Sequence, residues 1–326
     1  MADGGSRLTV LIALGANLGI AVAKAVAAAI TGSAAMAAEA GHSVADSVNE
    51  VLLLAGLRRS ARPADRRHPL GYGQERYIWS LLVAVTIFGM GALFAFLQGY
   101  EALVSGGEQE ESPIVAYVVL AISIALEAVS WTQAFHQVRA SAREHELPLG
   151  RYLSRTDDPP SISVLLEDSA ALIGLFLALG GVALHQVTGS AFWDGLASIL
   201  IGVVLTAVAL ALGRVNLGLL SGRQADPRLV RSIAGRLAAA PEVEALVDLV
   251  TLTTGADRVL VCARLDFRDT LSAGDLEEAC VRMSAELRAA HEEVDEIFIE
   301  PVPRDNAVLR SRIIGRYGRL PHADGT

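Results

Sequence analysis

The sequence predicts an α-helical membrane protein in which six transmembrane helices precede a small soluble α+β domain. Hydrophobic residues make up 52% of the chain and charged residues 19%, below the roughly 25% charged residues typical of soluble domains. Six apolar runs each approach or exceed the length that crosses a bilayer, which is about 20 residues. From Asp226 onward the pattern becomes that of a soluble domain.

The six predicted spans are separated by turn-prone breaks such as Gly106-Gly107 and Thr188-Gly189-Ser190. The second and fifth spans are the least apolar, because both carry acidic residues inside the run. The predicted spans cover residues 8–31, 35–57, 77–104, 112–136, 161–187 and 194–220, within a transmembrane domain of residues 1–221.

The placement of arginine predicts the orientation of the spans. The loops after spans two and four are rich in arginine, whereas the loops after spans one, three and five contain no lysine or arginine. The loop after span three is instead acidic, with Glu108, Glu110 and Glu111. Since positively charged loops stay on the cytoplasmic side, we expect both termini to be cytoplasmic and the protein to lie in the cell (inner) membrane.

The C-terminal region, residues 222–305, has the pattern of helix, strand, strand, helix, strand. This order in about 80 residues is typical of a small two-layer α+β unit. Ser272 and Asp275 resemble a capping box at the start of the second helix. Residues 306–326 are expected to form a flexible tail. Cys262 and Cys280 lack metal or disulfide spacing, so we expect reduced thiols, and nothing indicates a nucleic-acid-binding surface.

Polar and ionisable residues interrupt span two in the stretch AEAGHSVADSVNE, residues 38–50. Helical spacing places His42, Asp46 and Asn49 on one face, with Glu39 a turn earlier on the same side and Glu50 rotated away. Ionisable groups at membrane depth are costly, by roughly 2.5–3.5 kcal/mol each on insertion scales, and commonly mark an ion or proton path. An imidazole and a carboxylate one turn apart can bind the same divalent ion.

Span five supplies further carboxylates at Glu167 and Asp168, and span four supplies Glu127. His42 alone is also compatible with a hydrogen-bonded interhelical histidine. His42, Asp46 and Asp168 together are compatible with a buried polar network. A bound divalent cation is the simplest compensation for several acids in hydrocarbon, so we favour a metal site.

Four segments resemble the cation diffusion facilitator family, and most closely its branch of mitochondrial zinc transporter nine. They read TGSAAMAAEAGHSVADSVNEVLL, DRRHPLGYGQERYIWSLL, VLLEDSAALIG and WDGLASILIG. The resemblance covers roughly residues 8–300. It implies six spans, a ferredoxin-like C-terminal domain, homodimers in the lipid bilayer, and efflux of divalent cations in exchange for protons.

The resemblance also implies a set of metal ligands. His42 and Asp46 fall on the span-two ligands of the family, and Asp168 falls on the span-five aspartate. The family's span-five histidine position is occupied here by Val164, so the resemblance leaves the fourth donor open. We rank the candidates, with water completing the shell, in the order Asn49, Glu167 and Glu127.

The transported ion is expected to be Zn²⁺, although one imidazole with carboxylates also suits Fe²⁺, Co²⁺, Ni²⁺ or Mn²⁺. The ion is the substrate, and no cofactor is expected. A second metal in the loop after span two stays open, because His68 is present but Tyr72 stands where another histidine often lies. Metal binding by the C-terminal domain is not expected, since His291 is its one histidine.

Two other classes of protein compete with a transporter. A polytopic membrane metalloenzyme would share a buried metal site, but no HExxH or other hydrolytic motif is present. A non-transporting metal-binding scaffold would not need ligands within the membrane. We therefore expect a transporter and not an enzyme.

Overall fold

The computed structural model describes residues 3–105, 113–144, 148–155, 159–255 and 258–317. The acidic turn predicted at Glu108, Glu110 and Glu111 lies outside these residues. The chain divides into two compact units, one formed by residues 1–61 and 75–217 and the other by residues 62–74 and 218–326.

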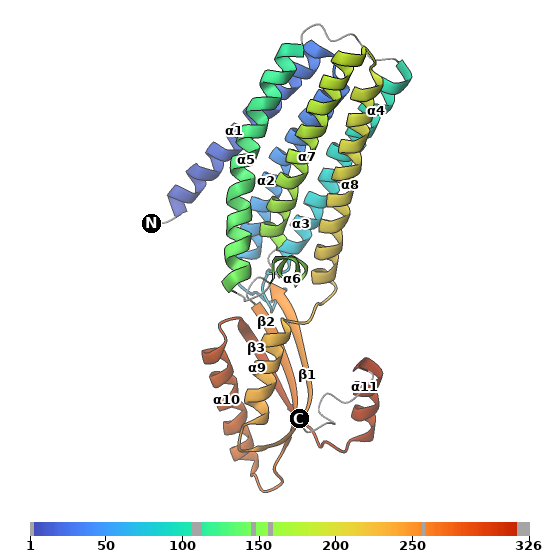
Figure 1. Ribbon diagram of the computed structural model, residues 1–326. Coiled ribbons are helices and arrows are strands. Elements are labelled where there is room, and N and C mark those ends of the chain that lie inside the picture. Colours follow the sequence, from blue (N-terminus) through green and yellow to red (C-terminus); the bar gives the residue numbers. More distant parts are fainter. Residues whose placement is uncertain (1–2, 106–112, 145–147, 156–158, 256–257, 318–326) are drawn as a thin grey trace. The chain divides into compact units, whose positions relative to one another are not determined.

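A helix lies at each of the six predicted spans (Figure 1). The third predicted span contains three consecutive segments, because a π-helical stretch interrupts it. The bounds are α1 Asp3–Thr31, α2 Ala34–Ser60, α3 Glu75–Thr86, η1 Ile87–Ala92, α4 Leu93–Ser105, α5 Pro113–Glu144, α7 Pro159–Thr188 and α8 Phe192–Leu220. A short helix that the sequence did not predict, α6, covers Leu149–Arg155.

Four helical segments among the described residues are long and apolar enough to cross a membrane: Glu75–Val104, Ile114–Arg143, Ile162–Thr188 and Phe192–Leu220. The described apolar part of α1 is shorter, Asn17–Thr31, and α2 carries the acidic and basic residues noted above. Large apolar side chains such as Val85, Leu97 and Ile122 are exposed on the surface of this unit. Exposed apolar side chains of this size are what a lipid environment covers, and with the four long apolar helices they make the protein a multi-pass membrane protein.

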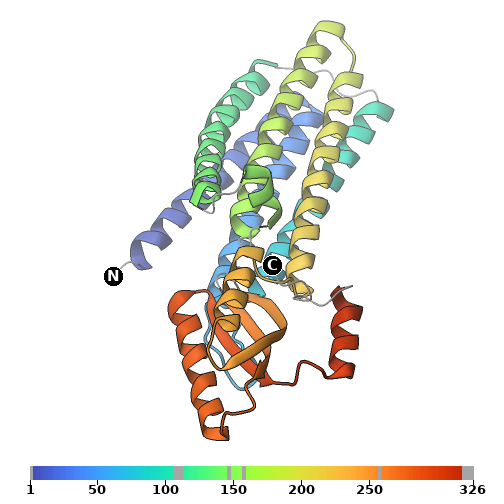
Figure 2. The same ribbon diagram turned by 60° about the horizontal axis from the view of Figure 1, so that its bottom comes forward.

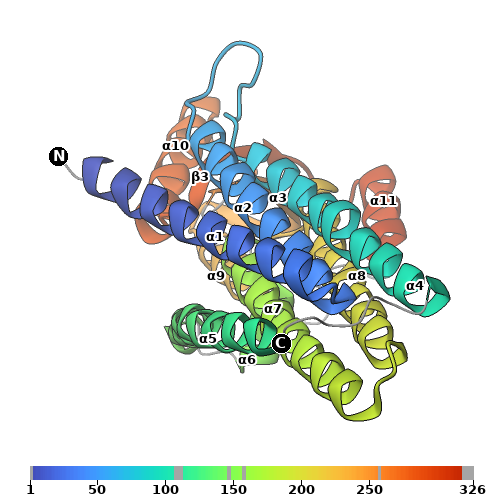
Figure 3. The ribbon, with the colours of Figure 1, turned by 90° about the horizontal axis from the view of Figure 1, so that it is seen from above.

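In the view from above, α2 lies beside α1 and α3, and α5 lies beside α7 (Figure 3). Small residues allow the helices to approach closely, as in other membrane bundles. At Gly99 of α4, an added Cβ atom would lie 2.8 Å from the carbonyl oxygen of Gly195 in α8. These two helices are therefore packed backbone against backbone.

Asp194 of α8 caps the N-terminus of α2. Its carboxylate, only 3% exposed, accepts hydrogen bonds from Ser33 Oγ at 2.7 Å and from the Ala34 amide at 2.5 Å, with the Ala35 amide at 3.3 Å. The first amides of a helix have no partner within the helix, and an anion near them is stabilising.

We expect Asp194→Ala to lower the free energy of unfolding by about 2–3 kcal/mol, because the change leaves buried donors without an acceptor. Denaturant unfolding of the full chain in detergent micelles measures this loss. The matched control is Asp226→Ala, which removes an exposed cap that accepts from the Arg228 amide and should cost about 1 kcal/mol. Equal losses in the two variants would contradict the special role of Asp194.

The second unit contains the predicted order of helix, strand, strand, helix, strand: α9 Pro227–Ala238, β1 Val243–Gly255, β2 Arg258–Phe267, α10 Ala273–Ala290 and β3 Val294–Pro301 (Figure 2). β1 pairs antiparallel with β2, and β2 pairs parallel with β3. Alternate residues of β2, including Val261 and Leu265, are buried in a core shared with α9 and α10. The full ferredoxin-like pattern has one strand more, so the coarser class, a small α+β domain, is what the structure shows.

Two features differ from the predicted domain organisation. The loop Arg62–Gln74 belongs to the same compact unit as the α+β domain, and an added Cβ atom at Gly73 would lie 2.5 Å from the Thr254 carbonyl oxygen in β1. The stretch predicted as a flexible tail contains the helix α11, Ala307–Tyr317. Asn306 accepts from the Leu309 amide at its start, and Ile313 is buried.

Candidate functional site

A cavity of about 260 Å³ lies within the helical bundle and is lined by residues of α1, α2, α5 and α7. Polar side chains dominate this lining, which is unusual inside a membrane domain. Five carboxylates line the cavity: Asp46, Glu50, Glu127, Glu167 and Asp168. Negative groups around one hollow in a low-dielectric surrounding concentrate cations there.

The α2 side of the cavity is a stripe along one helix face. Ser43, Asp46, Glu50 and Leu53 all line it, and their spacing of three or four residues places them one above another. Asn17 of α1 donates to Glu50 Oε2 at 3.3 Å. α1 therefore contributes to the same wall.

The α5 and α7 side is held together by two interhelical hydrogen bonds. Ser130 Oγ donates to Asp168 Oδ2 at 2.8 Å, and the Trp131 indole donates to Ser169 Oγ at 2.9 Å. Glu127 lies one turn before Ser130 on α5 and also lines the cavity. Val164, at the position where the resemblance implied a histidine, is a lining residue as well.

His42 and Asn49 lie behind this lining and are not part of it. His42 is 1% exposed, and its Nδ1 is 3.5 Å from Asp46 Oδ1. Within the described part of the chain, neither His42 ring nitrogen has a hydrogen-bond partner. Asn49 is fully buried and donates from Nδ2 to Glu167 Oε1 at 3.4 Å.

Four of the six predicted ligands therefore share one cavity: Asp46, Asp168, Glu167 and Glu127. His42 and Asn49 each approach one member of that group. Across the residues that the structure describes, no three His, Cys, Asp or Glu side chains come close enough together to hold a metal ion. The carboxylates surround the cavity without closing on a common point.

Four polar lining residues were not predicted from the sequence: Glu50, Asn17, Ser43 and Ser130. In the sequence analysis Glu50 was placed off the helix face of His42 and Asn49, because it lies about 80° around the helix from His42. It nevertheless shares a stripe with Asp46, which lies between the two faces. The four-residue spacing from Asp46 to Glu50 could have indicated that Glu50 shares the cavity face, whereas no sequence pattern indicates Asn17 or Ser130.

The loop after α2 is a tightly bonded turn. Asp65 Oδ1 accepts from the Arg67 and His68 amides at 2.8 and 2.7 Å, and Asp65 Oδ2 accepts from the Tyr72 hydroxyl at 2.7 Å. The Tyr72 hydrogen bond, followed by the His68 amide, lowers the pKa of Asp65 to about 2. The His68 ring lies against that of Tyr72, with 4.1 Å between centroids. Asp65 therefore has a structural role that uses both its oxygens.

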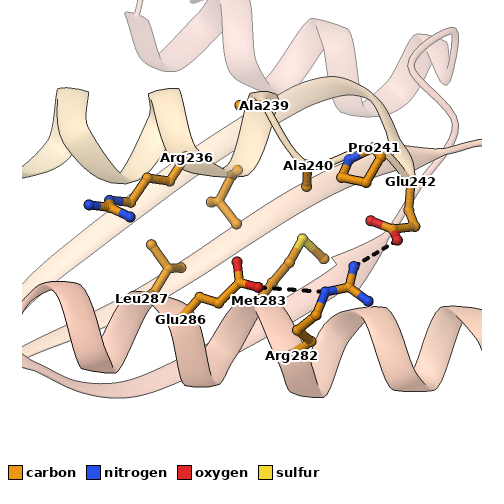
Figure 4. Close-up of a pocket in the computed structure, with 10 residues that line it drawn as sticks. Arg236, Ala239, Ala240, Pro241, Glu242, Arg282, Met283, Glu286 and Leu287 are labelled. Carbon is orange, nitrogen blue, oxygen red and sulfur yellow. Dashed lines mark ion pairs between the residues drawn. The ribbon is translucent and has the colours of Figure 1, made fainter.

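A separate pocket of about 590 Å³ lies between α9 and α10 in the α+β domain (Figure 4). Leu237, Met283 and Leu287 contribute its apolar lining. Arg282 pairs with Glu242 at 2.7 Å and with Glu286 at 3.6 Å, so these charges are mutually compensated. We therefore regard the carboxylate-lined cavity as the candidate site.

The chain is similar to membrane proteins that transport cations. Residues 10–221 match the cation efflux transmembrane domain. The protein named proton-coupled zinc antiporter SLC30A9, mitochondrial, of Xenopus laevis is 37% identical over 237 residues, which are 73% of this chain and 42% of that protein. The human protein of that name is 34% identical over the same shares of the two chains.

Metal tolerance protein C4 of Arabidopsis thaliana is 30% identical over 281 residues, covering 86% of this chain and 59% of that protein. The chain thus spans less than half the length of the SLC30A9 relatives that it matches. The names of these relatives are those of transporters and metal tolerance proteins, not of enzymes. The match over most of the transmembrane region and the identity to SLC30A9 proteins show that this chain belongs to the cation diffusion facilitator family, near its SLC30A9 branch.

Proposed function

We propose that this protein exports divalent transition-metal cations, with Zn²⁺ as the main substrate and protons as the exchanged ion. The cavity with five carboxylates carries the proposal, because such a lining attracts divalent cations and has no structural benefit in hydrocarbon. The relatives named as proton-coupled zinc antiporters support the choice of zinc and of protons.

The proposed ligands are His42, Asp46 and Asp168, completed by one glutamate and water. The His42 ring is buried next to Asp46, without another partner among the described residues, so a small rotation of α2 would bring His42 to the cavity beside Asp46. Histidine changes protonation near neutral pH and binds metal only when neutral. Proton binding on the far side of the membrane would therefore release the cation, and metal binding on the near side would release the proton.

A flux assay in proteoliposomes tests this function directly. Vesicles containing the full chain and a pH gradient would be presented in turn with Zn²⁺, Fe²⁺, Co²⁺, Ni²⁺, Mn²⁺ and Mg²⁺. We expect Zn²⁺ flux that depends on the gradient, and no flux of Mg²⁺, which prefers all-oxygen, strongly hydrated sites. Absence of flux for every ion would refute the transporter.

We further propose that the protein crosses the cell (inner) membrane six times, with both termini in the cytoplasm. We also propose that the α+β domain is related to the ferredoxin-like fold and that the protein forms a homodimer through both domains. The arginine-rich loops support the orientation. The family resemblance supports the domain type and the dimer.

Cysteine labelling tests the orientation. In a background with Cys262→Ser and Cys280→Ser, we expect Ser190→Cys and Gly107→Cys to react with a membrane-impermeant maleimide from outside intact cells, and Ala64→Cys to react only after lysis. Ser190 is chosen over Gly189, whose φ of +68° disfavours a side chain. The reverse labelling pattern would overturn both the orientation and the direction of transport.

A further inference from the structure

Lys24 of α1 is a buried cation next to the cavity. Its Nζ atom is 3.0 Å from Glu39 Oε2 and 2.9 Å from Ser43 Oγ, and Lys24, Glu39 and Ser43 are 2%, 0% and 6% exposed. A lysine on an outer helix face would extend its ammonium to the membrane surface. Lys24 instead holds its ammonium inside the bundle, where a charge is retained only if it has a partner and commonly serves a function.

Glu39 continues the stripe of α2 that forms the cavity wall. Residues 39, 43, 46 and 50 follow one another at spacings of four, three and four, so they lie on one helix face. Ser43 both lines the cavity and accepts the Lys24 hydrogen bond. The polar stripe therefore runs past the cavity to Glu39, and the Lys24 ammonium lies on that part of it.

One of the two carboxylate oxygens of Glu39 is not bonded to Lys24. Its Oε2 atom pairs with Lys24, whereas Oε1 is buried and has no hydrogen-bond partner among the described residues. Oε1 lies against Gly174 of α7, where a Cβ atom would collide with it. A buried carboxylate oxygen without a donor is costly, and the absence of a side chain at residue 174 is what leaves room for it.

We propose that Glu39 is an additional binding carboxylate for the transported divalent cation, and that Lys24 is its resident counter-ion, which must separate from Glu39 before the cation reaches it. The inference depends on the proposed function, since it assigns the next position on the same path. While the ion pair is intact, the ammonium repels a cation in the cavity from this end of the stripe. When the pair opens, Glu39 offers both oxygens in line with Asp46.

Two single substitutions should change zinc affinity in opposite directions. Lys24→Gln leaves Glu39 as an uncompensated anion, so the Kd for Zn²⁺ should fall by about tenfold and turnover should slow because the ion is retained. Glu39→Gln leaves the ammonium without its partner beside the cavity, so the Kd should rise by about tenfold. About tenfold is the smallest shift expected in either direction, because one unit charge a few ångströms from a divalent ion changes its affinity by more than that in a low-dielectric site.

The experiment measures Zn²⁺ binding by equilibrium dialysis on the full chain in detergent micelles, with flux in proteoliposomes on the same preparations. The double variant Lys24→Gln with Glu39→Gln removes the two charges together but also removes the proposed binding carboxylate, so its Kd should stay above the wild-type value. A return to the wild-type Kd would show that the pair acts only through its charges and would overturn the binding role of Glu39. Glu101→Gln serves as a matched control, since this exposed carboxylate of α4 lies outside the cavity lining and should leave the Kd unchanged.

A purely structural ion pair would behave differently, because either single substitution would weaken the fold and shift the Kd in the same direction. Shifts of the same sign, or no shift in either folded variant, overturn the inference while wild-type transport stays intact. If Lys24→Gln does not fold, Glu39→Gln decides alone, and an unchanged or lower Kd overturns the proposal. Absence of zinc binding and flux in the wild type would instead refute the proposed function itself.

Discussion

Asp46→Asn and Asp168→Asn are each expected to reduce Zn²⁺ flux at least about 100-fold. Both carboxylates line the cavity, Asp46 from α2 and Asp168 from α7, and removing a metal ligand costs more than the 10–100-fold typical of residues that only support one. The amide keeps the size of the side chain while removing its negative charge. Flux in proteoliposomes and Zn²⁺ affinity in micelles would be measured on preparations that elute as folded protein.

The control for these variants is again Glu101→Gln, which also removes one carboxylate from the transmembrane unit but from an exposed position. It should transport at the wild-type rate. Full activity in either aspartate variant would show that the cavity is not the transport site. A similar loss in Glu101→Gln would show that the assay reports on general damage.

Glu167→Gln is expected to lower flux by at least about 100-fold, as for the other proposed ligands, and Asn49→Ala by about tenfold, as for a residue that supports one. The structure provides a reason to place Glu167 ahead of Asn49, because Glu167 lines the cavity and Asn49 donates to Glu167 from behind. We therefore propose Glu167 as the fourth ligand, with Asn49 as a positioning residue. Asn49→Asp keeps the size of the side chain but replaces the amide donor to Glu167 with a second carboxylate, so a larger loss of flux than in Asn49→Ala would report the added charge repulsion.

Glu127→Gln belongs in the same series. Glu127 lines the cavity from α5, and it reaches the ion only if α5 stays close to α2 and α7 during binding. A silent Glu167→Gln together with an inactive Glu127→Gln would transfer the fourth ligand to α5. An inactive Asn49→Ala with normal Glu167→Gln would restore the order predicted from the sequence.

The positions of the helices could be predicted from the sequence because each apolar run is a local property of the chain. The helical period likewise placed Asp46 on one face with His42, whereas Asp168 was a candidate ligand as a carboxylate inside an apolar run and through the family resemblance. Which face of α2 meets the cavity could not be predicted, because Asp46 lies between the stripe of His42 and Asn49 and the stripe of Ser43 and Glu50. Only packing against α1, α5 and α7 decides between the two.

Long-range contacts explain the other differences. The capping of α2 by Asp194 joins residues 160 positions apart, and no local pattern encodes such a partner. The grouping of the loop Arg62–Gln74 with the α+β domain depends on its contact with β1. The π-helical stretch η1 has no sequence signal beyond its glycines, Gly89 and Gly91.

The cap on α2 also makes Ala34 the pivot point for any tilt of this helix. Asp194 fixes that end to α8, so α2 can tilt while its first turn stays in place. At a rise of about 1.5 Å per residue, His42 lies roughly 12 Å along the helix from Ala34, and Glu50 lies roughly 24 Å from it. A tilt of about 10° would carry His42 about 2 Å and Glu50 about 4 Å. The same tilt of α2 would therefore displace Glu50, at one end of the cavity, twice as far as it displaces His42.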